Sequence, residues 1–154
     1  MVVDRPGRWF SWDELAPRHA RMTDAVPDEV QHRLIILARM VLDPLRDAVG
    51  RPLGVTSGYR DEQYNRAIGG SATSDHPKGR AVDIRPPEGW LSTDLADLAV
   101  MVSGPWLDQV IAYHSSRGGH LHLSIRPEPR GEHLYAPPQG GYAGREYGAP
   151  LEIP

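Results

Sequence analysis

Two stretches decide the fold expected for this chain: SDHPKGRAVDIR at residues 74–85 and GHLHLSI at residues 119–125. In the first, small, polar and turn-forming residues precede an alternating run, which predicts a loop that leads into a strand over 81–85. The second also alternates and predicts a strand over 120–125. Side chains two residues apart leave the same face of a strand, so His120 and His122 share one face.

The same stretches carry residue types that bind a divalent metal: His76 in the loop, Asp83 on the following strand, and the His120–His122 pair. Burying an unpaired carboxylate in a strand is costly, and a bound dication would offset that cost. Two histidines and one carboxylate leave one position of a tetrahedral zinc ion open, as in catalytic zinc sites. A simpler interpretation stays open on spacing alone: Asp83 pairs with an arginine and the histidines are surface residues.

The flanking segments predict an α+β fold with a small, mainly antiparallel sheet and helices packed against it. Apolar residues at helical spacing predict a long helix from Pro27 that stops at Gly50, and Pro44 is expected to kink or split it. Further helices are expected over 61–68 and 92–103. Strands are expected over 53–57 and 107–113, and the latter should form a hairpin with 120–125.

Composition excludes several classes of protein. The chain has 154 residues, enough for one domain, and 17 Lys and Arg against 20 Asp and Glu give a net charge of −3. This balance argues against nucleic acid as a partner, since proteins that bind nucleic acid mainly through its phosphates are clearly basic. The absence of cysteine excludes disulfides and thiolate zinc sites. No apolar run reaches the roughly 20 residues of a membrane span, and the N-terminus lacks the apolar region of a signal peptide.

The two ends are expected to differ from each other. Aromatic residues near the start, with Ser11 and Glu14 spaced as a capping box, predict a short helical segment that packs on the body. We expect one domain over 1–126 that includes this segment. Residues 127–154 are rich in proline and glycine and predict a tail, extended over the body or partly disordered, that the metal site does not need.

The pattern Ser-x-His-x-x-Gly-x-Ala-x-Asp at 74–83, followed by His-x-His at 120–122, resembles the zinc D,D-peptidase group of the M15 metallopeptidases. The segments before the two motifs are also similar: TSGYR at 56–60, YN at 64–65 and GG at 69–70 before the first, and LDQVI at 107–111 before the second. The resemblance runs from about residue 10 to residue 126. GRAVDI at 79–84 with HLH at 120–122 also looks like the Hedgehog signalling domain, so a Hedgehog/DD-peptidase-like fold is implied.

The resemblance implies that His76, Asp83 and His122 are the ligands of a Zn²⁺ ion and that His120 lies beside the metal. It assigns Arg60 to the site, where a guanidinium would hold a substrate carboxylate or the negative charge on the attacked carbonyl oxygen. A structural pair between Arg60 and a neighbouring acid is the alternative.

Three further residues are expected to contact substrate or to support the ligands. Ser74 would hydrogen-bond the substrate or a water molecule, or else cap its loop. Asp108 would orient a ligand histidine, or else cap the start of its strand. Tyr113 is expected either to contact the substrate or to support a metal ligand.

The general base is not identified by the resemblance. Many relatives have a glutamate three residues before the last ligand, where this chain has Gly119, and others have one just after the strand over 107–113, where no acid occurs. His114 and His120 are the candidates, since a neutral imidazole accepts a proton near pH 7. Glu132 is a third candidate if the tail folds back.

The implied function is zinc-dependent hydrolysis of a peptide bond in bacterial peptidoglycan, as a D,D-carboxypeptidase, a D,D-endopeptidase or an L-alanyl-D-glutamate endopeptidase. The partner is then the peptidoglycan stem peptide, and we expect a monomer. Without a signal peptide, the expected setting is a phage lysin in the host cytoplasm before release, or a virion component. The alternative is a weakly active or inactive zinc-binding domain that recognises cell-wall peptides or a protein partner.

Overall fold

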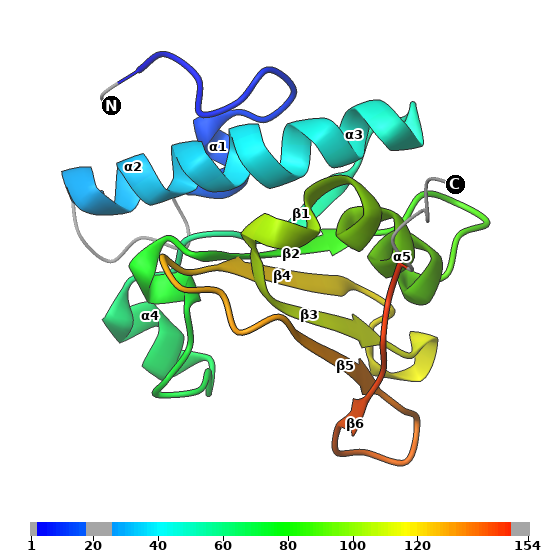
Figure 1. Ribbon diagram of the computed structural model, residues 1–154. Coiled ribbons are helices and arrows are strands. Elements are labelled where there is room, and N and C mark those ends of the chain that lie inside the picture. The colour runs from blue at the N-terminus through cyan, green and yellow to red at the C-terminus, as the bar shows by residue number, and fades with distance from the viewer. Residues whose placement is uncertain (1–2, 18–25, 149–154) are drawn as a thin grey trace.

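The computed structural model describes residues 3–17 and 26–148 and has an α+β fold built on a six-stranded sheet (Figure 1). The strands are β1 (Gly54–Ser57), β2 (Ala81–Arg85), β3 (Leu107–Tyr113), β4 (Leu121–Ile125), β5 (Glu132–Ala136) and β6 (Ala143–Gly144). The helices are α1 (Trp12–Leu15), α2 (Asp28–Leu37), α3 (Asp43–Val49), α4 (Glu62–Ala67) and α5 (Ser92–Ser103), with a π-helical segment at Ala38–Leu42 and short 3₁₀ turns at His76–Lys78, Gly104–Trp106 and Ser115–Arg117.

The sheet is mixed, which corrects the expectation of a mainly antiparallel one. Its order is β1-β2-β4-β3-β5-β6, and β3 pairs with β5 in parallel while the other neighbours are antiparallel. β4 returns antiparallel to β3, so it ends opposite Leu107, where β3 begins. Residues 126–131 then carry the chain past this end of β3, and the next strand starts there and runs in the same direction. The predicted hairpin of β3 and β4 is confirmed.

The C-terminal segment is part of the sheet. Sequence alone predicts an extended or partly disordered tail after residue 126, but β5 is hydrogen-bonded along β3 and β6 pairs with β5. Tyr147 is buried in the hydrophobic core, and its hydroxyl donates to the Leu134 carbonyl at 2.9 Å. Composition did not indicate that residues 132–136 pair with the edge of β3, and residues 149–154 of the predicted tail lie outside the described residues.

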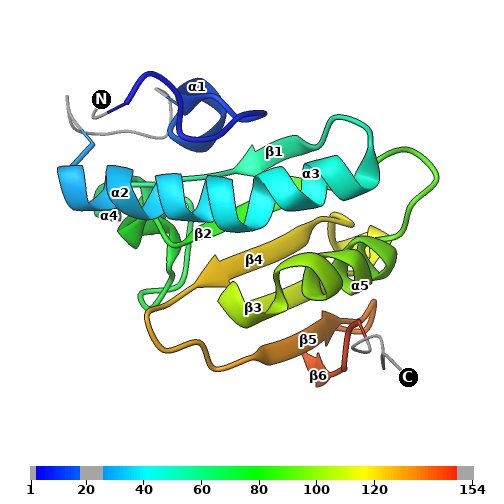
Figure 2. The same cartoon turned by 45° about the horizontal axis from the view of Figure 1, so that its top comes forward.

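The long helix and α5 cover one face of the sheet (Figures 1 and 2). The helix runs from Asp28 to Val49, and its register changes through the π-helical turn just before Pro44, which lies in the first turn of α3. Proline has no backbone N–H group, so one helical hydrogen bond is missing there, and the wider turn accommodates this loss. Gly50 ends the helix with a left-handed backbone, φ 73°, as predicted. Across both described ranges, no helix is long and apolar enough to cross a membrane.

The N-terminal segment packs on the body, as predicted. Ser11 and Glu14 form the expected capping box, and Phe10, Trp12 and Leu15 are buried. The end of α1 lies directly on Gly58, since a Cβ added there would lie 2.2 Å from the Leu15 carbonyl oxygen. Glycine is therefore required where this segment meets the end of β1.

Candidate metal centre

Strand register places Asp83 beside His122. In the antiparallel pair of β2 and β4 these two residues are directly opposite each other, so their side chains leave the same face of the sheet. Their neighbours Val82, Ile84, Leu121 and Leu123 point to the other face and are fully buried in the core. The alternation predicted for each strand thus holds, and the pairing of the strands joins the two candidate ligands.

His76 reaches the same place from the loop between α4 and β2. It begins a 3₁₀ turn that Gly79 ends with a φ of 72°, and a Cβ on Gly79 would lie 2.8 Å from the Val30 backbone and side chain. The Nδ1 atom of His76 lies 2.8 Å from the Gly58 carbonyl oxygen. Because a carbonyl only accepts, Nδ1 carries the proton and Nε2 keeps its lone pair for a metal.

The three side chains converge. His122 Nδ1 lies 2.8 Å from Asp83 Oδ1, and His76 Nε2 lies 3.4 Å from Asp83 Oδ2. One nitrogen or oxygen atom from each residue lies within 4.8 Å of the others. Burial alone would raise the pKa of Asp83, but the hydrogen bonds and charges of His122 and His76 outweigh it and hold this pKa well below its ordinary value.

This donor set fits a divalent cation. It offers two imidazoles, one carboxylate that is ionised at neutral pH, and a fixed tautomer on His76. The centroids of the two imidazole rings are 5.4 Å apart and the rings are tilted by 57°. The rings therefore do not stack, and the space between them is not closed by ring contact. The residues therefore suit a metal ion held by two nitrogens and one oxygen with room for a further ligand.

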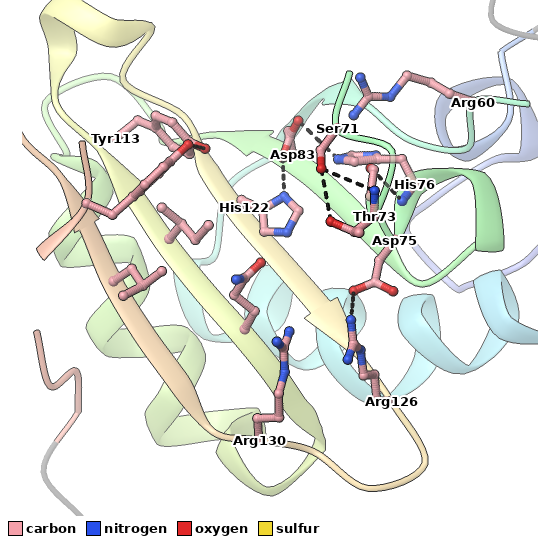
Figure 3. A pocket seen from close by; sticks show the side chains of 15 residues that line it. Arg60, Ser71, Thr73, Asp75, His76, Asp83, Tyr113, His122, Arg126 and Arg130 are labelled. Atoms are coloured by element: carbon pink, nitrogen blue, oxygen red, sulfur yellow. Dashed lines mark hydrogen bonds and ion pairs between the residues drawn. The ribbon is translucent and has the colours of Figure 1, made fainter. Parts of the chain in front are cut away.

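A pocket of about 500 Å³ opens in front of the three side chains (Figure 3). Arg60, Ser74 and Tyr113 line it, as the sequence suggests for residues that contact substrate. A second hollow of about 320 Å³ shares Arg60 and Asp83 with this pocket in its lining. Two hollows therefore meet at the candidate metal site.

Arg60 is half-buried and points towards the three side chains (Figure 3). Burial lowers its pKa, and the charge of Asp83 opposes this shift, so the guanidinium stays charged at neutral pH. Its Nε atom is buried without a hydrogen-bond partner among the described residues. Ser74 has a bond of its own, because its Oγ accepts the His76 backbone N–H at 3.2 Å. The loop-capping role of Ser74 is thus present, while the residue also lines the pocket.

An aromatic group forms another wall. Tyr113 stacks on His120 with ring centroids 4.2 Å apart and contacts Tyr142 edge to face, and the two hydroxyls are 3.2 Å apart. Burial, then the hydrogen bond to Tyr142, raises the pKa of the Tyr113 hydroxyl, so it stays protonated. Burial also lowers the pKa of His120. His120 therefore adjoins the pocket through Tyr113.

Two expected site residues lie elsewhere. Among the described residues, the partners of the His114 Nδ1 atom are Ser116 Oγ at 2.8 Å and the Ser116 N–H at 3.1 Å, and His114 does not line the pocket. Asp108 does not contact a candidate ligand. It is fully buried and paired with Arg130 at 2.7 Å and Arg126 at 3.3 Å. The pairing register shifts at Asp108, between Leu107 and Gln109.

Among the pocket-lining residues that the sequence did not indicate, four are charged or aromatic: Asp75, Arg126, Arg130 and Tyr142. Asp75 directly precedes His76 inside the motif, so its position in the sequence could have indicated that it lies near the site. The other three come from the segment after β4, where composition indicated only a tail. Glu132, proposed from this segment as a base, accepts a hydrogen bond from Gln109 at 2.6 Å and does not line the pocket.

The fold and site define a class of protein: an α+β domain with a histidine and aspartate cluster, suited to a metal, at an open pocket. The family model for Peptidase M15 matches residues 8–122, more than half of the chain, so the chain belongs to the M15 peptidase family. The match includes all three candidate ligands and ends at His122. A comparison with curated proteins gives no match.

Proposed function

We propose that this chain is a zinc-dependent peptidase that hydrolyses a peptide bond in the stem peptides of bacterial peptidoglycan. The observation that carries the proposal is the convergence of His76, Asp83 and His122 within 4.8 Å at the floor of an open pocket, in a member of a peptidase family. The preference for zinc comes from the donor set, since two imidazoles and one carboxylate suit zinc in catalytic sites. The substrate class and a fold of the Hedgehog/DD-peptidase type come from the sequence resemblance.

The mechanism follows from the positions of the side chains. His76, Asp83 and His122 would hold a zinc ion, which would supply Lewis acidity and activate water as the nucleophile at neutral pH. Gly58 fixes the tautomer of His76, and the 2.8 Å contact between Asp83 and His122 holds these two proposed ligands side by side. Arg60 directs its charge at the pocket, where it stabilises the oxyanion that forms on the attacked carbonyl, or holds a terminal carboxylate.

We propose His120 as the group that moves the proton to the leaving amine. It directly precedes β4, two residues before His122, and stacks on Tyr113, which lines the pocket. Neither His120 nor His114 lines the pocket itself, and His114 is less suited because Ser116 occupies its Nδ1 atom. Tyr113 stays protonated and adds a hydrogen-bond donor near the substrate. Ser74 offers its hydroxyl to the substrate or to water from the loop that carries His76.

The second hollow shares Arg60 and Asp83 with the main pocket, which supports a substrate that continues beyond the main pocket. An endopeptidase needs such space, whereas a carboxypeptidase needs to hold a chain end on one side. The pocket together with the second hollow thus favours cleavage within a stem peptide or a cross-link. Monomeric action, and delivery from a phage through the host cytoplasm or on a virion, stay predictions of the sequence.

The alternative function, a zinc domain that binds cell-wall peptides with little or no turnover, is favoured by one observation. Among the described residues that line the pocket, the carboxylates are Asp83 and Asp75. Asp83 is a proposed ligand, and Asp75 is paired with Arg126 at 3.2 Å. No glutamate in this lining takes the place of the one that many relatives use as a base.

One experiment separates the two functions. The zinc-loaded chain is incubated with purified peptidoglycan, and new free amino groups are measured over time. An enzyme releases amines, and release stops on chelation and in His122→Ala. His32→Ala, which removes an exposed histidine from α2, serves as the matched control and should leave release unchanged. Tight binding to peptidoglycan without release would identify the binding module instead.

A further inference from the structure

We infer that Arg126 and Arg130 form a binding site for a carboxylate of the peptide substrate, across the metal ligands from Arg60. The inference rests on the proposed function and names part of its specificity. Figure 3 places Arg60 on one side of His76 and His122 and the two arginines on the other. Both arginines lie outside the segment 8–122 that the family model matches.

One buried carboxylate holds the two arginines together. Asp108 has no exposed surface and receives the Nη2 atom of Arg130 at 2.7 Å, its Nε at 3.0 Å and its backbone N–H at 2.9 Å. The Nε atom of Arg126 lies 3.3 Å from the same carboxylate. Arginines fixed in this way lose little conformational freedom when they bind a ligand, so the site is preorganised.

Arg126 also links this site to the metal ligands. Its Nη2 atom lies 3.2 Å from Asp75 Oδ2, and Asp75 directly precedes His76 in the chain. The Asp75 carbonyl accepts the backbone N–H groups of Lys78 and Arg80, which fixes the 3₁₀ turn around His76. A carboxylate bound by Arg126 is therefore held at a defined position relative to the proposed metal.

Both guanidinium groups have donors left for a ligand. The two Nη1 atoms have no hydrogen-bond partner within the described part of the chain. The side chains line the pocket and are 32 % and 45 % exposed for Arg126 and Arg130. A planar guanidinium matches the two oxygens of a carboxylate, and such pairs are among the stronger hydrogen bonds in proteins.

The charges favour a carboxylate over a more highly charged anion. Asp75 and Asp108 formally balance the two arginines, so attraction by net charge is small and the free N–H donors dominate. A single carboxylate uses these donors without adding a second uncompensated charge. Stem peptides offer two sources of this group, the α-carboxylate of D-glutamate and the terminal carboxylate.

The test uses three synthetic pentapeptides: L-Ala-γ-D-Glu-L-Lys-D-Ala-D-Ala, the same peptide with the D-glutamate α-carboxylate amidated, and the same peptide with a C-terminal amide. Binding to the chelator-treated full chain is measured by calorimetry and by NMR titration up to millimolar peptide. One of the two amidations should weaken binding by about tenfold to a hundredfold, the range of a hydrogen bond to a charged group. The sensitive position identifies the source of the carboxylate.

Variants assign the effect to the arginines. Arg130→Gln should remove the preference for the free acid, and Arg130→Lys, which keeps a charge beside Asp108, should reduce it. Arg51→Gln is the matched control, because it removes the same charge at an exposed position outside the pocket. Equal binding of all three peptides by the unaltered chain, or no binding by any of them, overturns the inference without need of a variant.

Hydrolysis by the zinc-loaded chain separates this inference from the proposed function. A chain that cleaves all three peptides at equal rates and binds them equally keeps its proposed function and loses the carboxylate site. A chain that cleaves none but binds the free acid selectively through Arg130 keeps the site and loses the peptidase.

Discussion

The two walls of the pocket differ in how the chain builds them. His76, Asp83 and His122 come from two short motifs, at 74–83 and 120–122, and strand pairing and one 3₁₀ turn place them. Arg126, Arg130 and Tyr142 come from residues after β4, beyond the family match, and are placed by a buried ion pair and an aromatic contact.

This difference separates two tasks. The motif wall carries groups whose chemistry is the same for any peptide bond, namely metal ligands and a positive charge near the carbonyl. The wall made by the later segment carries donors and rings suited to the side chains and ends of a particular peptide. Substitutions in the first wall should therefore act on turnover, and substitutions in the second on stability or on the choice of substrate.

The largest expected effect is the loss of the metal in Asp83→Ala. This change removes the oxygen donor and leaves two imidazoles, so bound zinc and peptidase activity should both fall below detection. Zinc per chain, measured by elemental analysis after dialysis, checks the result. Asp13→Ala, at an exposed position of α1, should keep the zinc content of the unaltered chain. Full occupancy in Asp83→Ala would show that the ligand set is wrong.

The second wall is tested by two tyrosines from one segment. Tyr147 is 3 % exposed and Tyr142 is 57 % exposed. Tyr147→Ala should lower the free energy of unfolding by roughly 3–5 kcal/mol, the cost of deleting a large buried side chain. Tyr142→Ala should cost less than about 1 kcal/mol and change substrate affinity instead. Urea unfolding checks both values.

Equal losses of stability in the two variants would show that Tyr147 is not part of the core. Truncation after Arg130 extends this test, because it deletes β5 and leaves β3 as an edge strand. The composition of the segment predicts that the metal site survives this truncation. The pairing of β5 with β3 predicts a loss of stability that the isolated motif does not reveal.

Local patterns predicted most of the fold. The capping box at Ser11, the left-handed stop at Gly50 and the alternation of β2 and β4 each depend on a few neighbouring residues, and the structure confirms them. The parallel pairing of β5 depends on which edge of β3 is free once β4 has paired. The position of a free strand edge cannot be deduced from neighbouring residues in the sequence. The proline and glycine content of the segment therefore indicated only a tail.

The site shows the same division. The motif predicted that His76, Asp83 and His122 lie together, and the structure brings them within ligand distance, while zinc itself stays a prediction. Asp108 was expected to orient a ligand histidine. Instead the register shift at the start of β3 places it against Arg130, a contact across 22 residues that no spacing rule indicates.

Arg60→Ala should lower kcat by about a hundredfold, because removing one group that stabilises an oxyanion costs this much or more. The zinc content should stay at one per chain, since Arg60 is not a proposed ligand. Steady-state kinetics on a soluble stem peptide, with zinc measured on the same sample, checks both parts. A rise in KM at constant kcat would mean that Arg60 holds a substrate carboxylate and not the oxyanion.

The smallest expected effect is a pH dependence of stability from Asp108. Burial acts to raise its pKa, but the hydrogen bonds and charge of Arg130 outweigh burial and lower it below the value of about 3.9 for an unfolded chain. The stabilisation from this carboxylate is therefore complete above about pH 4 and is lost as the pH falls from there through the lower pKa of the folded state. Thermal unfolding of the metal-free chain and of Asp108→Asn should differ at pH 7 and converge on acidification. A constant difference in Tm down to pH 3 would mean that this ion pair contributes no pH-dependent stability, and the second wall would then depend on Tyr147 and strand pairing alone.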